Sequence, residues 1–256
     1  MNYRNQQGFT MVELAIVVLV MGLLIGGLMM PLAVQRENAR VRDGHEQLET
    51  ARLAIEGYAL VNGHLPCPAT PASNGTAATA AGGCVAQHGF VPATTLDLNG
   101  NRNDDNLLLD PWGSPLRYSV TTSDADGNGS WDFVTPGEMR SVTMPVLSPE
   151  LVVCSTAAGS TPTACGSANV TLADRAPAVM YSIGKDWASF SSADQVENTG
   201  ATLGGGPSAT NYRVASDDVF VRAGRSDLAG SEFDDLVIWI PENSLYARLV
   251  QSGQLP

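Results

Sequence analysis

Oxygen-bearing side chains gather in one short stretch of the sequence, between positions 124 and 132. The stretch reads DADGNGSWD, and its first six residues match the D-x-D-x-N-G beginning of an EF-hand calcium loop. Carboxylate and amide oxygens are the ligands that Ca²⁺ prefers, so Asp124, Asp126, Asn128 and Asp132 are candidate ligands. Thr135 stands where such a loop carries a bidentate glutamate. A glycine-rich hairpin turn therefore explains the stretch nearly as well.

Residues suited to catalysis form no comparable pattern. The three histidines, His45, His64 and His88, stand outside any HExxH or H-x-E arrangement, and neither G-x-S-x-G nor G-x-x-x-x-G-K-[ST] occurs. We therefore expect a protein that is not an enzyme, with no catalytic residue. The formal net charge of −12 argues against a nucleic-acid partner, because phosphate binding needs clustered lysines and arginines.

The four cysteines form two local pairs, Cys67 with Cys84 and Cys154 with Cys165. Neither pair has the C-x-x-C spacing of a zinc or redox motif. In an exported protein, two disulfides are the natural interpretation, each stabilising a loop-rich domain by about 2–4 kcal/mol. Free buried thiols are the alternative, and the sequence alone leaves the connectivity open.

An uncharged run from Leu14 to Val34 follows a short polar start. A helix over this run is about 32 Å long, which is enough to cross the hydrocarbon core of a membrane. The run is longer than the apolar core of an ordinary signal peptide, and no clean small-x-small cleavage site follows it. A plain membrane anchor is an alternative, but it leaves Glu13 unexplained.

Glu13 stands at the edge of this apolar run, where an unpaired carboxylate is energetically costly and therefore indicates a function. If the chain is cut between Gly8 and Phe9, the new α-amine of Phe9 is only four residues away. In a filament, the amine of one subunit can neutralise Glu13 of its neighbour as the apolar helices pack.

Residues 8–14, Gly-Phe-Thr-Met-Val-Glu-Leu, closely resemble the class III signal of type IV prepilins and type II secretion pseudopilins. The resemblance implies that a prepilin peptidase cuts between Gly8 and Phe9 and N-methylates Phe9. It also implies that Glu13 serves assembly by pairing with the terminal amine of a neighbouring subunit. The implied partners are other pilin or pseudopilin subunits, the peptidase, and the inner membrane with its assembly platform.

Helical spacing of apolar residues continues beyond the run, through Leu48, Ala51, Ile55 and either Tyr58 or Ala59. We expect one helix over about 9–61, whose amphipathic second half rests on a β-sheet and which ends at Asn62-Gly63. Residues 67–90 are expected to form a disulfide-stapled surface loop. Later segments predict the short strands of an antiparallel sheet: 115–122, 131–135, 141–147, 178–183, 218–222 and 235–241.

The expected fold is therefore α+β and pilin-like, with a long N-terminal helix packed on an antiparallel β-sheet head that carries loop insertions. The expected division of the chain is a leader over 1–8, a transmembrane and filament-core helix over 9–34, an amphipathic continuation over 35–62, and a periplasmic or extracellular head over 63–256.

Three further segments resemble parts of the major pseudopilin of type II secretion: DPWGSPLRY at 110–118, YSIGKD at 181–186 and FDDL at 233–236. In that family the two late segments build a calcium site. The resemblance thus implies Asp234 and Asp235 as ligands, with help from main-chain oxygens near Ile183. A pair of solvated aspartates at a strand start is the alternative. The chain departs from that subunit in its greater length and in its two cysteine pairs.

The sequence thus predicts a structural subunit of a type IV pilus-like or type II secretion pseudopilus filament. We expect it to cross the inner membrane once with its head in the periplasm, before it enters a periplasmic pseudopilus or an extracellular pilus. No cofactor is required by the sequence, and Ca²⁺ is the one that it suggests. A calcium-dependent, membrane-tethered adhesin is the alternative function.

Overall fold

The computed structural model describes residues 10–200 and 217–256, without the side chains of 25–32. The chain divides between Arg42 and Asp43 into two compact units. Helix α1 (Met11–Asn62) contributes to both units, and each unit is described by itself below.

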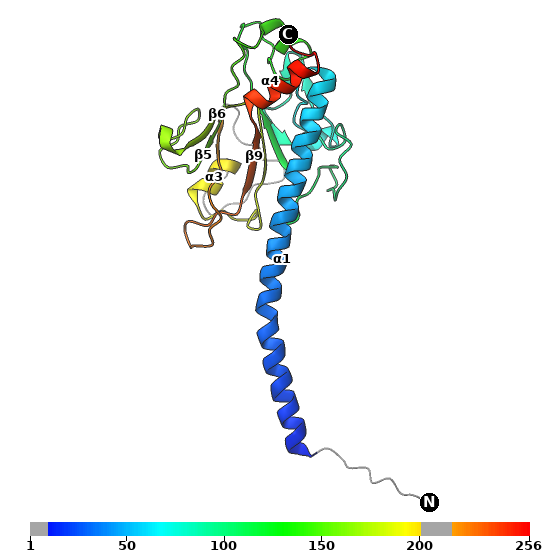
Figure 1. The fold of residues 1–256 in the computed structure, drawn as a ribbon, viewed down its shortest axis with the longest axis vertical. Coiled ribbons are helices and arrows are strands. Elements are labelled where there is room, and N and C mark those ends of the chain that lie inside the picture. The colour runs from blue at the N-terminus through cyan, green and yellow to red at the C-terminus, as the bar shows by residue number, and fades with distance from the viewer. Residues whose placement is uncertain (1–9, 201–216) are drawn as a thin grey trace, which may run out of the picture. The chain divides into compact units, whose positions relative to one another are not determined.

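Helix α1 confirms the single long helix predicted over about 9–61, since it runs unbroken from Met11 to Asn62 (Figure 1). It continues through the backbone of Gly22 and of residues 25–32. Gly63 ends the helix in the left-handed conformation, with φ at 75°, and its N–H donates to the carbonyl of Ala59 at 2.8 Å. A glycine is the residue best suited to this position, because it has no Cβ to oppose a positive φ.

The larger sheet of the head has four antiparallel strands in the order β3-β4-β7-β9. They are β3 (His88–Phe90), β4 (Arg117–Val120), β7 (Ala178–Ser182) and β9 (Leu236–Ile240). The predictions of strands within 115–122, 178–183 and 235–241 are confirmed. The expectation of a surface loop over 67–90 is wrong at its end, because the buried residues of β3 pair with β4 as the edge of this sheet.

The second sheet has three strands in the order β6-β5-β8. Strand β5 (Leu151–Cys154) pairs antiparallel with β6 (Thr171–Ala176) and parallel with β8 (Val219–Val221). The strand predicted over 218–222 is confirmed. The wholly antiparallel head is corrected, since the long connection from β5 to β8 allows a parallel pair. A two-stranded hairpin, β1 (Thr79–Ala80) with β2 (Gly83–Cys84), stands apart from both sheets.

Two predicted strands are wrong. Residues 131–135 form turns, with the N–H of Thr135 donating to the carbonyl of Trp131 at 3.1 Å. Residues 141–142 belong to helix α2 (Glu138–Val142), and turns follow it. Apolar and β-branched residues form a strand only where a partner strand accepts their hydrogen bonds, and the described chain provides none at either place. The other helices of the described residues are α3 (Ala193–Thr199), α4 (Glu242–Gln251), and the 3₁₀ turns η1 (Pro71–Ser73) and η2 (Ala168–Val170).

One core cluster of the head joins the two larger sheets. Its buried side chains come from β5, β6, β7, β8 and β9 and from the segment that follows β7: Leu151, Val153, Ala176, Val179, Tyr181, Ile183, Phe190, Phe220 and Val237. Within it, the rings of Tyr181 and Phe220 meet edge to face, with centroids 5.4 Å apart.

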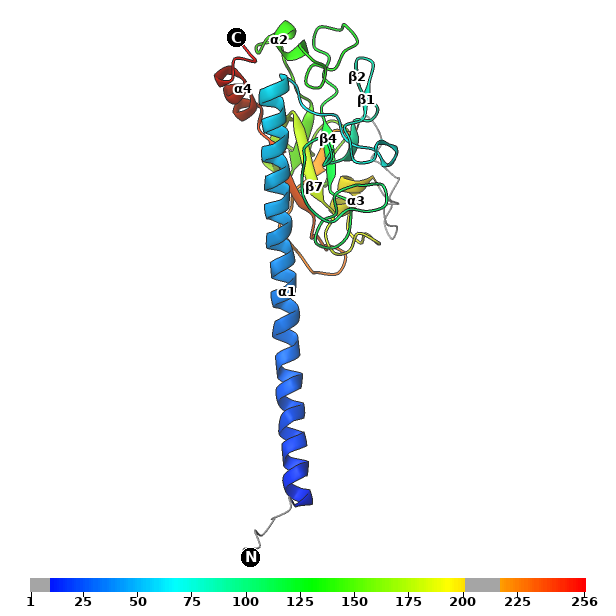
Figure 2. The same ribbon diagram turned by 90° about the vertical axis from the view of Figure 1, so that its right-hand side faces the viewer.

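The C-terminal part of α1 belongs to the head through one apolar stripe. Leu48, Ala51, Ile55 and Ala59 have no exposed surface, as the helical spacing predicts. Figure 2 shows this part of α1 running beside β4 and β7. A Cβ on Gly44 would meet Leu236 of β9 at 2.8 Å, so the small residue lets the helix approach the sheet closely.

Candidate functional site

The predicted processing residues, Gly8 and Phe9, lie outside the described residues, and their roles stay predictions. Directly after them, Thr10 and Glu13 form a reciprocal capping box at the start of α1. The backbone N–H and the hydroxyl of Thr10 each donate to Glu13 Oε2 at 2.9 Å. The N–H of Glu13 donates to Thr10 Oγ1 at 3.3 Å. This arrangement satisfies N–H groups that the first turn of a helix otherwise leaves unpaired.

The sequence analysis missed this capping box, although the T-x-x-E pattern before an apolar run is its known signal. Glu13 therefore has a local role within one chain, besides the predicted pairing with a neighbour's amine. The two roles are compatible, because the capping box uses only Oε2. Within the described part of the chain, no hydrogen bond to Oε1 is found.

The first turns of α1 expose an unusual amount of apolar surface. Between Met11 and Leu24 the large apolar side chains are exposed all around the helix, from 46% for Val20 to 93% for Met11. Such a surface is unfavourable in water and indicates that something apolar covers it.

A search of the described residues finds no helix that is both long and apolar enough to cross a membrane. The membrane span predicted over 14–34 therefore stays a prediction, and part of it, 25–32, lies outside the described side chains.

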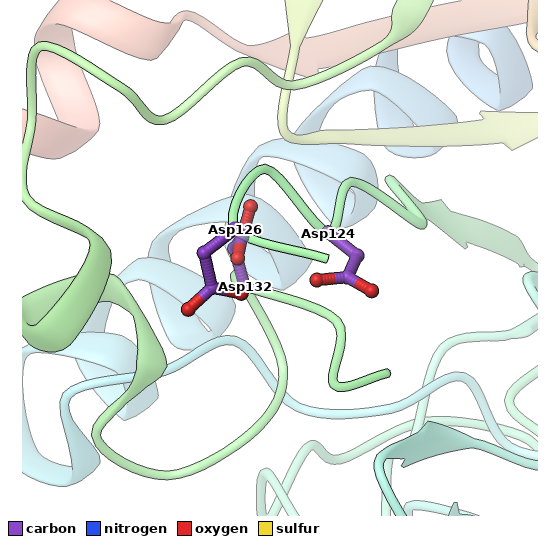
Figure 3. A group of neighbouring side chains, drawn as sticks. All are labelled: Asp124, Asp126 and Asp132. Atoms are coloured by element: carbon purple, nitrogen blue, oxygen red, sulfur yellow. The ribbon is translucent and has the colours of Figure 1, made fainter. Parts of the chain in front are cut away.

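The acidic loop, residues 124–132, brings three of its predicted ligands together. One carboxylate oxygen each of Asp124, Asp126 and Asp132 lie within 4.8 Å of one another, and Figure 3 shows the three side chains gathered in this loop. They are the one such group of three metal-ligating side chains in the part of the chain that the structure describes. The predicted neighbourhood of these three aspartates is thus observed, while their role as ligands is untested.

Asn128 forms hydrogen bonds within the acidic loop through both its backbone and its side chain. Its N–H donates to Asp124 Oδ1 at 3.0 Å and to Asp126 Oδ1 at 3.2 Å. Its Nδ2 donates to Asp126 Oδ2 and to Glu138 Oε2, both at 3.0 Å. Glu138 begins α2 and was not among the predicted ligands, because it lies three residues beyond the place that an EF-hand loop assigns to glutamate.

Asp132 is the buried member of the acidic loop, with 0% of its surface exposed. Its Oδ2 accepts the hydroxyl of Ser123 at 2.8 Å and the N–H of Ala125 at 3.0 Å. Its Oδ1 has no hydrogen-bond partner among the described residues. Burial raises the pKa of Asp132 above its ordinary value, and the charges of Asp126 and Asp124 raise it further. A cation would reverse this repulsion.

The three segments that resemble the major pseudopilin lie side by side. Strand pairing places Arg117 opposite Tyr181 and Ser182 opposite Leu236. Asp110 accepts the hydroxyl of Ser182 at 2.5 Å, so the 110–118 segment is tied to the last residue of β7.

Asp234 is buried, with 4% of its surface exposed, and the interpretation as a solvated aspartate is wrong for it. Its Oδ2 accepts the N–H of Lys185 at 2.6 Å and its Oδ1 accepts Gln195 Nε2 at 3.1 Å. Burial raises the pKa of Asp234 to about 7, and the adjacent Asp186 contributes to this rise. Gly184 takes a φ of 68°, and a Cβ there would overlap the carboxylate of Asp234.

Asp235 is also buried, with 6% of its surface exposed, but it faces other partners. Its Oδ2 accepts Asn198 Nδ2 from α3 at 2.7 Å, and burial raises its pKa well above the ordinary value. The side chain of Ile183 lies in the core cluster between the two larger sheets. In the described chain these residues join no group of three metal-ligating side chains, so the calcium site implied for Asp234, Asp235 and Ile183 stays a prediction.

An open cavity of about 360 Å³ lies next to Asp234. Lys185 and Asp227 form an ion pair at its wall, with Nζ and Oδ1 2.5 Å apart. The remaining lining residues are Asp186, Ser189, Ser226, Glu232, Phe233 and Asp234. The cavity has both charges on its wall, and no described feature selects one ligand for it or favours the adhesin alternative.

Both predicted disulfides are present, Cys67–Cys84 and Cys154–Cys165. The first links the segment after α1 to the hairpin strand β2. The second ties the end of β5 to the loop that precedes β6. The alternative of free buried thiols is therefore wrong.

Comparison with known proteins bears on the first segment of the chain. Residues 3–29 match the family model of the prokaryotic N-terminal methylation motif. Comparisons with curated proteins and with solved structures found no match to the chain. The motif spans the predicted cleavage position, the capping box of α1 and the exposed apolar turns that follow. The chain therefore carries the class III methylation signal that is typical of type IV pilins and pseudopilins.

Proposed function

We propose that this protein is a structural subunit of a type IV pilus-like or type II secretion pseudopilus filament. The observation that carries the proposal is the methylation motif over 3–29, which leads directly into a helix with exposed apolar turns. In this proposal a prepilin peptidase cuts between Gly8 and Phe9 and methylates the new amine of Phe9. The proposal assigns no catalytic activity and no nucleic-acid partner to the chain.

Exposed apolar turns support both stages of the proposed life of the subunit. Residues 14–34 first anchor the chain in the inner membrane, with the head in the periplasm. The same turns then leave the lipid and pack against equivalent helices of other subunits. Either environment removes from water the side chains that α1 exposes between Met11 and Leu24.

Glu13 sets the register in the proposed filament. A carboxylate among packed apolar helices needs a positive partner, and the amine of a neighbouring subunit's Phe9 supplies one. Oε2 of Glu13 is held by Thr10, and in this proposal Oε1 is the oxygen that accepts the neighbour's amine. The capping box thus positions the group that the proposed ion pair uses.

Mass spectrometry of the assembled protein tests the processing step. We expect the mature chain to begin at Phe9 with a methylated amine and to lack residues 1–8. A Gly8→Val variant, which blocks the cut, should accumulate at full length in the membrane and stay out of filaments. A native N-terminus still at Met1, or one near Val34, would overturn the proposal.

Three substitutions separate the charge of Glu13 from its capping role. Glutamine also serves at the third position of a capping box, so Glu13→Gln keeps the helix start and loses the charge. We expect Glu13→Gln and Glu13→Ala alike to reduce filament incorporation by at least about tenfold, the equivalent of about 1.4 kcal/mol.

Thr10→Val is the matched control, because it removes the hydroxyl but keeps the carboxylate and the backbone N–H of residue 10, which still donates to Glu13 Oε2 and holds it in place. It should assemble close to normally, as counted by subunit content in sheared filaments. Normal assembly of Glu13→Gln together with failure of Thr10→Val would assign Glu13 to helix capping alone.

A further inference from the structure

The acidic loop, residues 124–132, lies at a built corner of the head. Its Trp131 N–H donates to the carbonyl of Gly82 at 2.8 Å, and the indole of Trp131 packs so closely on Gly83 that a Cβ there would meet it at 2.8 Å. The N–H of Asp132 donates to the carbonyl of Ser123 at 2.8 Å, which closes the loop at its base. The C-terminal end of the loop is therefore held against the β1–β2 hairpin, and the two ends of the loop are joined to each other.

Charge is concentrated in this loop without a compensating cation from the side chains that the structure describes there. Asp124, Asp126 and Asp132 place carboxylate oxygens within 4.8 Å of one another, and none of them forms an ion pair with a described residue. Their recorded partners are neutral: backbone N–H groups, the Ser123 hydroxyl and the Asn128 amide.

A second, independent observation comes from Asp132. This side chain has no exposed surface, yet its Oδ1 lacks any hydrogen-bond partner among the described residues. A buried carboxylate oxygen without a donor is strongly unfavourable. A cation bound by the two neighbouring carboxylates would supply the missing partner, and it would also offset their mutual repulsion.

Glu138 can supply the glutamate carboxylate that an EF-hand loop has at its twelfth position and that this loop lacks. The twelfth position holds Thr135, which has no carboxylate. The turn over 131–135 and the first residue of α2 instead bring Glu138 to Asn128, whose amide nitrogen bridges Asp126 Oδ2 and Glu138 Oε2 at 3.0 Å each. A positively polarised group thus already lies between two carboxylates. Rotation of that amide turns its oxygen to the same place.

We propose that the acidic loop is a calcium site, with Asp124, Asp126 and Asp132 as its ligands and Asn128 and Glu138 completing the oxygen shell. Calcium fits because it accepts several carboxylates and an amide oxygen in flexible geometry, whereas Mg²⁺ demands a near-ideal octahedron and keeps most of its waters. The bound ion fixes the loop against the hairpin that Cys67–Cys84 ties down. The site is separate from the filament proposal and does not depend on it.

Calcium titration of the purified full-length chain in detergent micelles tests the proposal. We expect saturable binding by calorimetry below about 1 mM CaCl₂, the range of extracellular calcium modules, and a Tm that rises by about 2–5 °C with the ion. Tb³⁺ should show luminescence sensitised by Trp131, which Ca²⁺ displaces. Absence of both heat and sensitised luminescence in the native chain would overturn the site.

The variants locate the ion. Asp126→Asn and Glu138→Gln should each weaken Ca²⁺ binding by at least about tenfold. In EDTA, Asp126→Asn should unfold at the same or a higher temperature than the native chain, because it removes repulsion. A variant that weakens Ca²⁺ binding without lowering the Tm in EDTA has lost a ligand, whereas loss of a residue that merely supports the fold would lower the Tm in EDTA as well.

Asp174→Asn, at an exposed residue of β6, is the charge-matched control and should bind Ca²⁺ normally. Asp234→Asn tests the alternative that the ion binds at Asp234 and Asp235. Binding that survives Asp126→Asn, or that disappears with Asp234→Asn and not with Asp126→Asn, would contradict the assignment to the acidic loop.

Discussion

Burial decides what each aspartate of the head can do. Asp126 is exposed, whereas Asp110, Asp132, Asp234 and Asp235 are almost completely enclosed. Each buried carboxylate accepts at least one backbone or side-chain donor, but desolvation still raises the pKa of all four. The sequence gives the positions of the aspartates but does not indicate which of them are buried.

Asp234 should make the stability of the head depend on pH. Its pKa of about 7 in the folded chain lies above the value near 3.9 of an unfolded chain. As the pH rises from about 4 to 7, the unfolded chain ionises first, so stability falls over this range and levels off above it. After discounting for solvent screening, the loss is on the order of 2 kcal/mol.

Urea unfolding in EDTA at pH 5, 6 and 7.5 measures this slope. Asp234→Asn should reduce the slope, and the raised pKa of Asp235 should leave a residual slope of the same sign. Asp174→Asn should leave the slope unchanged. Equal slopes for Asp234→Asn and the native chain would show that Asp234 is not the source of the pH-dependent stability.

Gly184 makes room for the carboxylate of Asp234. Gly184→Ala should destabilise the head by about 2–4 kcal/mol, because it combines a positive φ with a clash against Asp234. Gly230→Ala is the matched control, since its φ is 78° and a Cβ there meets nothing within 4 Å. It should cost only about 1 kcal/mol. Chemical denaturation of both variants gives the difference, and equal losses would show that the contact with Asp234 is unimportant.

At the scale of elements, helix α1 and strands β4, β7, β8 and β9 could be predicted, because each has a sustained apolar period or a β-rich run between turn residues. Strand β6 could not, since the charged pair Asp174 and Arg175 interrupts its few apolar residues and only Ala176 is buried. The turns over 131–135 look like a strand locally, and only the absence of a partner strand in the described head reveals the error. The T-x-x-E pattern of the capping box is visible in the sequence, whereas the contact of Glu138 with Asn128 depends on the turns over 131–135, which the sequence does not specify.

Helix α4 is tied to α1 through one buried carboxylate. Glu56, with a side chain 1% exposed, accepts Arg52 Nη1 at 2.7 Å from its own helix and also pairs with Arg248 of α4. Arg248→Met should destabilise the head by about 1–3 kcal/mol, because it removes one of the two cations from a buried charge. Thermal melts measure the loss.

The exposed Arg140 of α2 provides the control for this prediction. Arg140→Met should change stability by less than about 0.5 kcal/mol. If Arg248→Met is equally mild, the link between α1 and α4 contributes packing alone.

At the scale of the whole molecule, the division between Arg42 and Asp43 separates two kinds of surface. Every buried apolar side chain of the described core lies at or beyond Leu48, while the described turns from Met11 to Leu24 bury none. The first unit therefore depends on surroundings outside the chain, and the second contains its own core. The sequence predicts this contrast, since an uncharged run gives way to an amphipathic helix after Arg36.

The head should accordingly fold by itself when it keeps its own part of α1. We expect residues 43–256 to be a soluble fragment with one cooperative unfolding transition and four cysteines that do not react with thiol reagents, because both pairs are bonded. The two crosslinks close short loops and contribute about 3 kcal/mol each, so reduction should lower the Tm by more than about 10 °C. A fragment of residues 63–256 is the control: it loses Leu48 and Ile55, which have no exposed surface, and should not unfold cooperatively. If the shorter fragment were as stable as the longer one, the amphipathic half of α1 would be dispensable to the head. The burial of Leu48 and Ile55 would then contribute nothing to the stability of the sheets.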